Sequence, residues 1–166
     1  MKRILLILLI SFLTSSLYAQ FQQQLTSSEI LQGIKKLNVV GSVLYIAAHP
    51  DDENTRLLTY LSKEMKLRTG YLSITRGDGG EQFFTRANDF GYSKNPEETF
   101  QFWKKDTILS DMVWIIRNFK PDVIICRFPT TGEGGHGHHT ASALLAVEAY
   151  SAAADPSRFP WQLKFT

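Results

Sequence analysis

Cysteine is almost absent from this chain, with a single residue, Cys126, in 166. One cysteine cannot form an intramolecular disulfide, so a disulfide-stapled fold is excluded. Because Cys126 ends an apolar run that begins at Val123, we expect it to be a small buried residue rather than a nucleophile. The chain also lacks internal repeats and low-complexity tracts, which leaves an ordinary globular domain as the expectation.

A surplus of positive charge is also lacking. The 18 basic residues face 16 acidic ones, and removal of Lys2 and Arg3 with an N-terminal leader would make the numbers equal. Binding to nucleic acid or to an acidic membrane surface needs a clustered basic face, which this sequence does not show. We therefore expect neither nucleic acid nor an acidic membrane as a partner.

The longest apolar run, from Ile4 to Leu13, is shorter than the roughly 20 residues that span a bilayer. It follows two basic residues and precedes a short polar segment that ends at Ala19, which is the pattern of a secretory signal peptide. An uncleaved membrane anchor is the alternative, and a lipid anchor is excluded because no cysteine follows the run. We predict a signal peptide over 1–19, export to the periplasm or the extracellular space, and no stable membrane insertion after cleavage.

The rest of the chain is predicted to form a linker with a short helix over 20–40 and one domain over 41–166. Ser27 or Ser28 would cap the short helix. At the other end, residues 160–166 resemble the start of a strand with no closing polar tail. This pattern suggests a domain truncated at its C-terminus, cut from a longer protein.

Strand and helix patterns alternate along the domain. The expected strands are 43–48, 71–75 and 122–126, and the expected helices are 53–66, 99–118 and 140–154. Such alternation predicts an α/β, Rossmann-like three-layer sandwich with a mainly parallel sheet. Ligands of such folds bind beyond the carboxyl ends of the strands.

All four histidines follow predicted strands, at that edge of the sheet. His49 comes directly after the first strand and precedes Asp51 and Asp52, whereas the other three lie in the segment 136–139 after the third strand. Imidazole nitrogens and carboxylate oxygens are good zinc ligands, and three of them with an open position are typical of a catalytic zinc. The carboxylates alone could merely favour a helix N-terminus, and the histidines alone could lie in an exposed glycine-rich turn.

The segment 48–53, with the sequence AHPDDE, and the segment 136–139, with the sequence HGHH, carry a family resemblance. The chain resembles the PIG-L or LmbE-like deacetylases, which have a (P/A)HPDDE motif after the first strand and an HxDH motif after a later one. The segment 75–80 is similar to the TxGxGG loop of that family. The resemblance spans roughly residues 43–149 and implies a zinc enzyme that removes N-acetyl groups from glucosamine-containing substrates.

The resemblance also implies roles. His49, Asp52 and His139 match the zinc ligands, Asp51 matches the general base, and His136 matches the histidine that steadies the oxyanion and acts as an acid. His138 replaces the aspartate of HxDH, which in the family neighbours and tunes the histidine matched by His136. The replacement would alter the charge state of His136 and the pH optimum, and would let His138 compete with His139 as a ligand.

The segment from Arg76 to Glu98 is predicted to be a long loop, and loops of this length are usually functional or disordered. We name Arg76, Asp78, Arg86 and, from the other loop, His138 as candidate substrate contacts. The aromatic side chains of the long loop would either stack on sugar faces or pack the loop onto the domain. Its glycines do not form a P-loop, because the Lys-Ser/Thr ending is absent.

The expected function is thus hydrolysis of the N-acetyl group of an N-acetylglucosamine-type sugar or glycoside, with release of acetate. Zinc would supply an activated water, and Asp51 would take its proton. Fe(II) or Co(II) could occupy the same ligands. The alternatives are a non-catalytic carbohydrate- or metal-binding module that retains the fold, and hydrolysis of another linear amide. The sequence does not define the oligomeric state.

Overall fold

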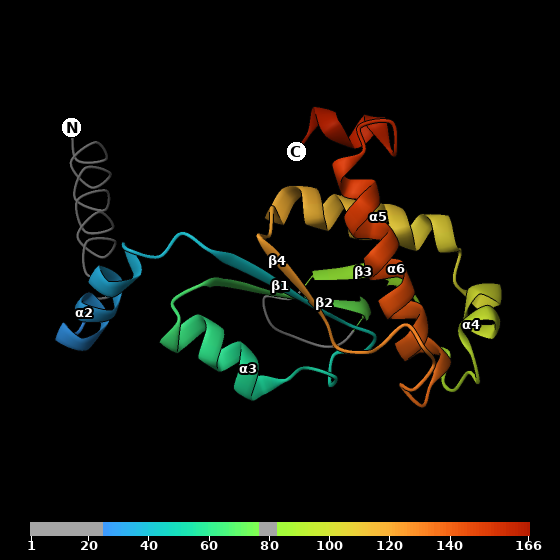
Figure 1. Cartoon of the computed structure of the whole chain (residues 1–166), viewed down its shortest axis with the longest axis horizontal. Coiled ribbons are helices and arrows are strands. Elements are labelled where there is room, and N and C mark those ends of the chain that lie inside the picture. Colours follow the sequence, from blue (N-terminus) through green and yellow to red (C-terminus); the bar gives the residue numbers. More distant parts are fainter. Residues whose placement is uncertain (1–24, 77–82) are drawn as a thin grey trace, which may run out of the picture. The chain divides into compact units, whose positions relative to one another are not determined.

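The computed structural model describes residues 25–76 and 83–166 (Figure 1). The chain divides into two compact units at Leu37–Asn38. In the first unit, helix α2 spans Ser27–Lys36 and begins at Thr26, whose side chain accepts from the main-chain N–H of Glu29 in a capping box. The short helix is therefore present, but its cap is Thr26 rather than either serine. The predicted signal peptide lies outside the described residues.

A four-stranded parallel sheet forms the centre of the second unit. Its strands are β1 (Ser42–Ala47), β2 (Arg68–Thr75), β3 (Phe83–Ala87) and β4 (Val123–Cys126). They lie in the order β3-β2-β1-β4, and every neighbouring pair is parallel. The first strand, β1, is therefore central, and later strands of the chain pair on both sides of it, as in doubly wound folds.

Strand β1 shows why helices cover both faces of the sheet. Side chains alternate along a strand, and here both sets are apolar and buried. Leu44 and Ile46 pack in the larger core, whereas Tyr45 and Ala47 pack in a smaller cluster that includes Leu57 of the helix after β1. The predicted Rossmann-like three-layer α/β fold is confirmed.

The helices follow the strands in alternation. Helix α3 (Thr55–Thr59) continues into a π-helical turn, η2 (Tyr60–Glu64), and covers one face of the sheet. Helices α5 (Lys105–Phe119) and α6 (Gly137–Ala154) cover the other face, and α4 (Pro96–Phe102) packs beside α6 (Figure 1).

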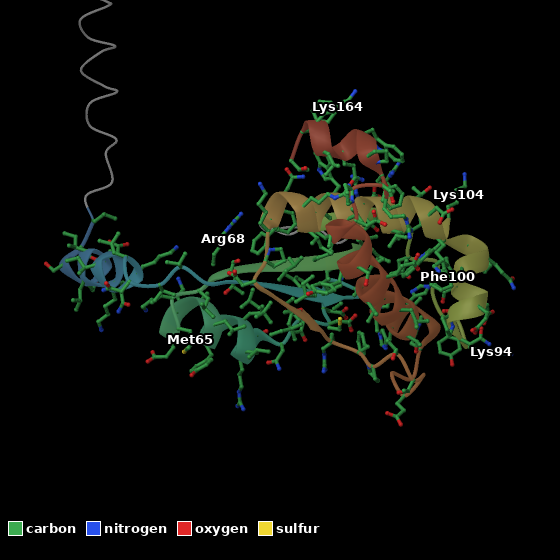
Figure 2. The ribbon with its side chains drawn as sticks, turned by 45° about the horizontal axis from the view of Figure 1, so that its top comes forward. Met65, Arg68, Lys94, Phe100, Lys104 and Lys164 are labelled. Carbon is green, nitrogen blue, oxygen red and sulfur yellow. The ribbon has the colours of Figure 1, made fainter. Side chains whose placement is uncertain are left out.

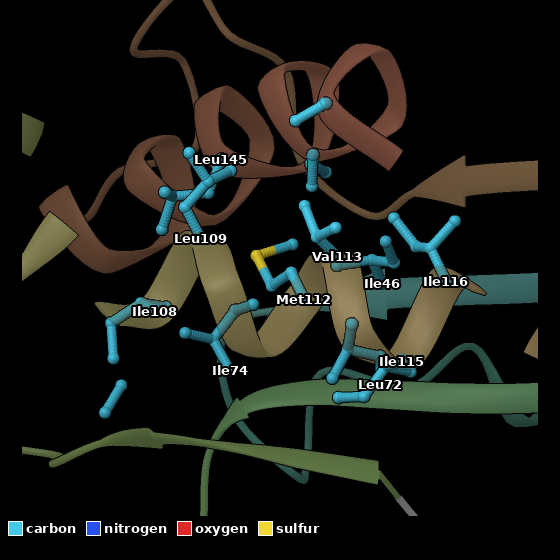
Figure 3. Close-up of a cluster of buried hydrophobic side chains, with 14 of the residues drawn as sticks. Ile46, Leu72, Ile74, Ile108, Leu109, Met112, Val113, Ile115, Ile116 and Leu145 are labelled. Atoms are coloured by element: carbon cyan, nitrogen blue, oxygen red, sulfur yellow. The ribbon is translucent and has the colours of Figure 1, made fainter. Parts of the chain in front are cut away.

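The main hydrophobic core lies between α5, α6 and the sheet (Figure 3). Leu109, Met112 and Val113 of α5 are fully buried against Ile74 of β2 and Leu145 of α6. Burial of a side chain of this size stabilises the fold by about 1.5–3 kcal/mol. This layer fixes α6, which carries three of the four histidines at its N-terminus.

One predicted helix is two helices in the structure. Residues 99–118 divide at Trp103, whose extended backbone ends α4 before α5 begins at Lys105. Trp103 is buried, and its indole N–H donates to the Asn88 carbonyl at 2.9 Å. The prediction of one continuous helix was wrong because this long-range contact outweighs the local helical pattern.

The predicted long loop contains a strand. β3 begins at Phe83 and pairs with β2, with an irregularity between Ser73 and Thr75. Thr85 of β3 is buried and its hydroxyl donates to the Ile74 carbonyl at 2.6 Å. The loop prediction failed here because alternating side chains of mixed polarity in this edge strand gave no continuous apolar run.

Two further predictions, a strand over residues 160–166 and a buried Cys126, are also wrong. Residues 160–166 do not form a strand, since a 3-10 helix, η3, spans Pro160–Lys164 after a left-handed Phe159. Gln162 holds it by donating to the Ser110 carbonyl at 2.8 Å. Cys126 is exposed rather than buried, because β4 is the edge strand of the sheet.

Three lysines illustrate the charged surface of the domain. Lys94, Lys104 and Lys164 are exposed and extend from the ribbon (Figure 2). Within residues 25–76 and 83–166, no helix combines the length and the apolar content that a bilayer crossing requires.

Candidate metal centre

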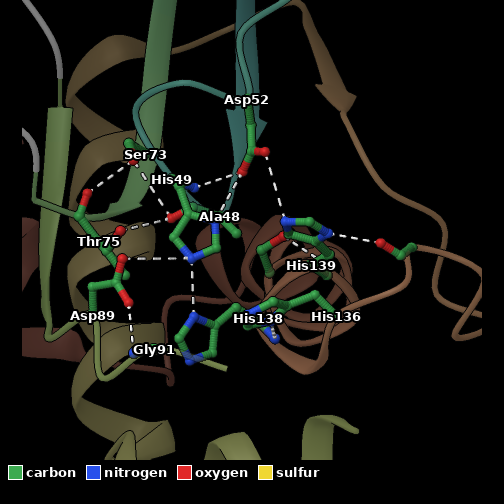
Figure 4. A network of polar contacts seen from close by, with 12 residues as sticks. Ala48, His49, Asp52, Ser73, Thr75, Asp89, Gly91, His136, His138 and His139 are labelled. Carbon is green, nitrogen blue, oxygen red and sulfur yellow. Dashed lines mark hydrogen bonds and ion pairs between the residues drawn. The ribbon is translucent and has the colours of Figure 1, made fainter. Parts of the chain in front are cut away.

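The two histidine-bearing loops meet at the carboxyl edge of the sheet. His49 follows β1 within two residues, and the N-terminus of α6 is reached through the loop after β4. β1 and β4 are parallel neighbours, with Val43 opposite Val123, so both loops leave the sheet at the same end. Figure 4 shows His49, Asp52, His136, His138 and His139 gathered there.

His49 and Asp52 are placed by one tight turn. The Asp52 N–H donates to the His49 carbonyl at 3.2 Å, and Asp52 Oδ2 accepts from the His49 N–H at 2.8 Å. The same Oδ2 lies 3.3 Å from His49 Nδ1. The carbonyl of Ala48 accepts from the main-chain N–H and the hydroxyl of Thr75, which ties the start of this turn to β2. Local sequence therefore sets two of the candidate ligands.

His139 comes from α6 and faces the same carboxylate. Its Nε2 lies 3.6 Å from Asp52 Oδ1. Its Nδ1 lies 2.7 Å from the carbonyl of Gly134, which can only accept, so the neutral form of the ring carries its proton on Nδ1 and keeps a lone pair on Nε2. The ring of Phe128 stacks on the imidazole in parallel, 3.8 Å between centroids. The orientation of His139 is thus fixed on both the hydrogen-bonding edge and one face.

Together these three side chains form a group that can hold a metal ion. The donor atoms of His49, Asp52 and His139 all lie within 4.8 Å of one another. Two imidazole nitrogens and one carboxylate oxygen are ligands that suit zinc. The hydrogen bond from His139 to Gly134 is the outer contact that metal-binding histidines usually make.

His138 lies on the other side of His49. It is fully buried, and its Nδ1 is 2.9 Å from His49 Nε2. Trp103 stacks on the ring at 4.8 Å and Phe90 meets it edge-on at 4.4 Å. Its Nε2 is buried and has no hydrogen-bond partner among the described residues. His49, Asp89 and His138 form a second group with metal-ligating atoms within 4.8 Å.

His136 is the N-cap of α6. Its Nδ1 accepts from the main-chain N–H of His138 at 3.0 Å, which satisfies one of the free donors of the first helical turn. Its ring lies 5.1 Å from that of His139 and 5.6 Å from that of His49, and Tyr92 contacts it edge-on. His136 therefore borders the group formed by His49, Asp52 and His139 without being one of its three members.

The environment of the site shifts the pKa values of its side chains in different directions. Burial disfavours protonation of His49, but the hydrogen bond to Asp52 and the nearby carboxylates outweigh it and raise the pKa of His49. Burial also opposes ionisation of Asp52, yet the hydrogen bonds from His49 lower the pKa of that carboxyl group. Burial and the neighbouring imidazoles lower the pKa of His138 to about 4, and the same causes lower the pKa of His136. His138 is therefore neutral at pH 7.

The other predicted site residues do not all join this cluster. Asp51 is exposed between the two ligand candidates, and Arg76 is exposed after β2. Arg86 instead pairs with α5, since its guanidinium makes a bidentate ion pair with Asp111, in which the shortest N–O distance is 2.7 Å. Asp78 lies outside the described residues.

Several neighbours of the histidines were not predicted. Asp89, from the supposed loop, has an oxygen 3.9 Å from His49 Nε2. The hydroxyl of Tyr71 donates to the carbonyl of His49 from within β2. Gly137 allows α6 to approach the segment before α4, because an added Cβ would lie 2.4 Å from the carbonyl oxygen of Asn95. Phe128, which stacks on His139, alone carried a signal, since it lies two residues after the third strand, whereas the others depend on long-range packing.

A scan against protein-family models and a search of curated proteins both give no match for this chain. The likeness to the PIG-L or LmbE-like deacetylases therefore depends on the short sequence motifs alone.

Proposed function

We propose that this protein is an exported zinc-dependent deacetylase of the PIG-L or LmbE-like type, which removes the N-acetyl group from an N-acetylglucosamine-type sugar or glycoside. The observation that supports it best is the convergence of His49, Asp52 and His139 from two loops distant in sequence. Asp51, between two of these residues, has an exposed side chain and is free to meet a substrate.

The donor set fits zinc, with Fe(II) or Co(II) as other candidates. His49, Asp52 and His139 would hold the ion, which leaves a position for water or substrate. When bound, zinc supplies a Lewis acid that polarises an amide carbonyl and lowers the pKa of water. Metal binding to these residues needs neutral imidazoles, and the hydrogen bond from His139 Nδ1 to Gly134 already leaves Nε2 free for it.

Two residues of the chain would handle protons. Asp51 would accept the proton of the attacking water, and general-base assistance of this kind contributes roughly 10²–10⁴-fold. His136 borders the ligands and would donate a hydrogen bond to the oxyanion that develops on the acetyl group. The proton held by Asp51 would then pass to the amine as the C–N bond breaks, with the free amine and acetate as the products.

The test combines metal analysis with product release. The purified protein should contain about one zinc per chain and should release acetate from N-acetylglucosamine or simple glycosides, and a chelator should stop the release. Absence of metal after purification without chelators would refute the site.

The variant Asp51→Asn separates catalysis from binding. It should keep the zinc and lose turnover by roughly 10²–10⁴-fold, because the amide cannot accept the proton. Asp106→Asn is the matched control, since Asp106 is an exposed aspartate of α5 in the first helical turn. Unchanged turnover in Asp51→Asn would remove Asp51 as the base. Zinc and sugar binding without any turnover in the native protein would instead support a non-catalytic module.

A further inference from the structure

His49 directs its two ring nitrogens at different partners. Nδ1 lies 3.3 Å from Asp52 Oδ2, on the side of the ring that faces the carboxylate shared with His139. Nε2 faces His138 Nδ1, at 2.9 Å, on the opposite edge of the ring. Figure 4 shows the His138 ring against the far edge of His49, away from Asp52.

This arrangement constrains the ring proton of His49. A neutral imidazole carries one proton, and a nitrogen that binds a metal cannot carry it. If Nδ1 binds the metal, the proton must be on Nε2. The acceptor at hydrogen-bonding distance from Nε2 is His138 Nδ1, because Asp89 Oδ2 is 3.9 Å away.

We propose that His138 is a positioning residue of the metal centre, which accepts the proton of His49 Nε2–H and so holds His49 in the tautomer and orientation that bind the ion through Nδ1. This inference rests on the proposed metal site. A metal-binding histidine usually donates this outer hydrogen bond to a carboxylate, a main-chain carbonyl or water. Here a second imidazole takes that place.

The surroundings of His138 support a fixed role. The ring lies between Trp103 and Phe90 and is fully buried, and this packing restricts its position and its tilt. With Nδ1 as the acceptor, the proton of His138 is on Nε2, which is buried without a partner among the described residues. A buried polar atom without a partner costs stability, so its retention points to a function of the ring.

The main rival is a second metal ion held by His49, Asp89 and His138. In that case His49 would have to bind an ion through each of its nitrogens at once. The 2.9 Å distance between the two ring nitrogens is instead that of a direct hydrogen bond. Metal stoichiometry distinguishes the two arrangements.

The first test compares two substitutions of His138. His138→Phe keeps a flat ring between Trp103 and Phe90 but has no acceptor, whereas His138→Asn offers its Oδ1 close to the original Nδ1. Zinc affinity, measured by competition with a coloured chelator, should fall by roughly 10–100-fold in His138→Phe. His138→Asn should recover most of that loss, which a purely structural role of the ring would not produce.

Phe90→Leu is the matched control, because it alters the packing around His138 but leaves the acceptor in place. Its zinc affinity should stay close to that of the native protein. Unchanged affinity in His138→Phe, or an equal loss in Phe90→Leu, would overturn the proposal. Two zinc ions per chain, with one lost in both His138→Phe and Asp89→Asn, would replace it with the two-metal arrangement.

A metal-free measurement separates this inference from the proposed function. A ¹⁵N–¹⁵N coupling across the hydrogen bond should join His49 Nε2 and His138 Nδ1 in the apoprotein and vanish in His138→Phe. Absence of the coupling would refute the paired imidazoles even if zinc binds. If the coupling is present but the native protein binds no metal, the proposed function fails first and the inference with it.

Discussion

The two ends of helix α6 carry polar clusters of opposite character. At the N-terminal end, His136 caps the helix and His138 and His139 face His49 and Asp52. At the C-terminal end, the guanidinium of Arg117 donates to five main-chain carbonyls and to Gln162 Oε1. These carbonyls belong to Ala152, Ala153, Asp155, Arg158 and Phe159.

The difference lies in how completely each cluster satisfies its own polar atoms. Arg117 is buried, and all of its recorded contacts are with carbonyl or amide oxygens that close the end of α6, where the helix dipole also favours a cation. In the histidine cluster, His138 Nε2 has no partner among the described residues and His139 Nε2 is 3.6 Å from its carboxylate. A saturated cluster holds the fold together, whereas an ordered cluster with unused donors and lone pairs is suited to a ligand.

The largest effect should come from the saturated end. Arg117→Met should lower the free energy of unfolding by at least about 3 kcal/mol, because several carbonyls lose their donor at about 1–3 kcal/mol each. Chemical denaturation of the metal-free protein measures this loss. Arg86→Met is the control, since its exposed pair with Asp111 should contribute at most about 1 kcal/mol. If the folded fraction of Arg117→Met also lost its zinc, the two ends would not be independent.

A smaller free-energy effect, confined to metal binding, should come from the other end. His139→Ala removes a candidate ligand and should weaken zinc binding by more than about 100-fold, beyond the loss expected for an outer residue. Its effect on the stability of the metal-free protein should be far below that of Arg117→Met, because the half-buried imidazole makes a single hydrogen bond, with Gly134, among the residues that the structure describes. Zinc titration and denaturation of the same sample would test both statements. A large loss of metal-free stability would instead make His139 a structural residue.

The smallest effect should come from a partly exposed charge on the same helix. Glu148 contacts Lys105 at 2.8 Å and Arg158 at 3.4 Å, and hydrogen bonds from these side chains lower the pKa of its carboxyl group despite some burial. A lowered pKa in the folded state stabilises the protein above the unfolded value near 4.5, and this contribution is lost as the pH falls through the folded pKa. Glu148→Gln should therefore cost at most about 1 kcal/mol at pH 7 and less at pH 3. An equal cost at both values would show that the charge is not responsible.

Much of the fold was predictable because its elements are strongly patterned. Strand β1 is apolar on both faces, which only a sheet covered on both sides can bury, and the structure confirms the parallel α/β arrangement. The prediction was wrong where a contact with a residue distant in sequence sets the local backbone conformation. Trp103 leaves the helical path to reach Asn88, and Gln162 draws residues 160–164 into a 3-10 helix against α5.

The site was predictable in its residue types but not in its pairings. Placing His49 and the segment 136–139 at one edge required only the rule that parallel strands end together. The family resemblance assigned His139 to the group with Asp52, but the residue spacing alone could not select it, since neighbouring residues at a helix start point about 100° apart and the orientation of α6 selects between them. In the structure His139 faces Asp52, whereas His138 turns towards His49 and Trp103.

The sequence by itself determined the layered α/β fold, the tight turn that joins His49 to Asp52, and the gathering of histidines at one sheet edge. These follow from short-range periodicity and from local hydrogen bonds, which do not depend on distant residues. Only the tertiary structure decided which face of α6 is buried, and with it the exposure of each histidine. The reason is physical: the packing of α5 and α6 on the sheet, the buried indole of Trp103 and the close approach at Gly137 rotate the helix into a single orientation.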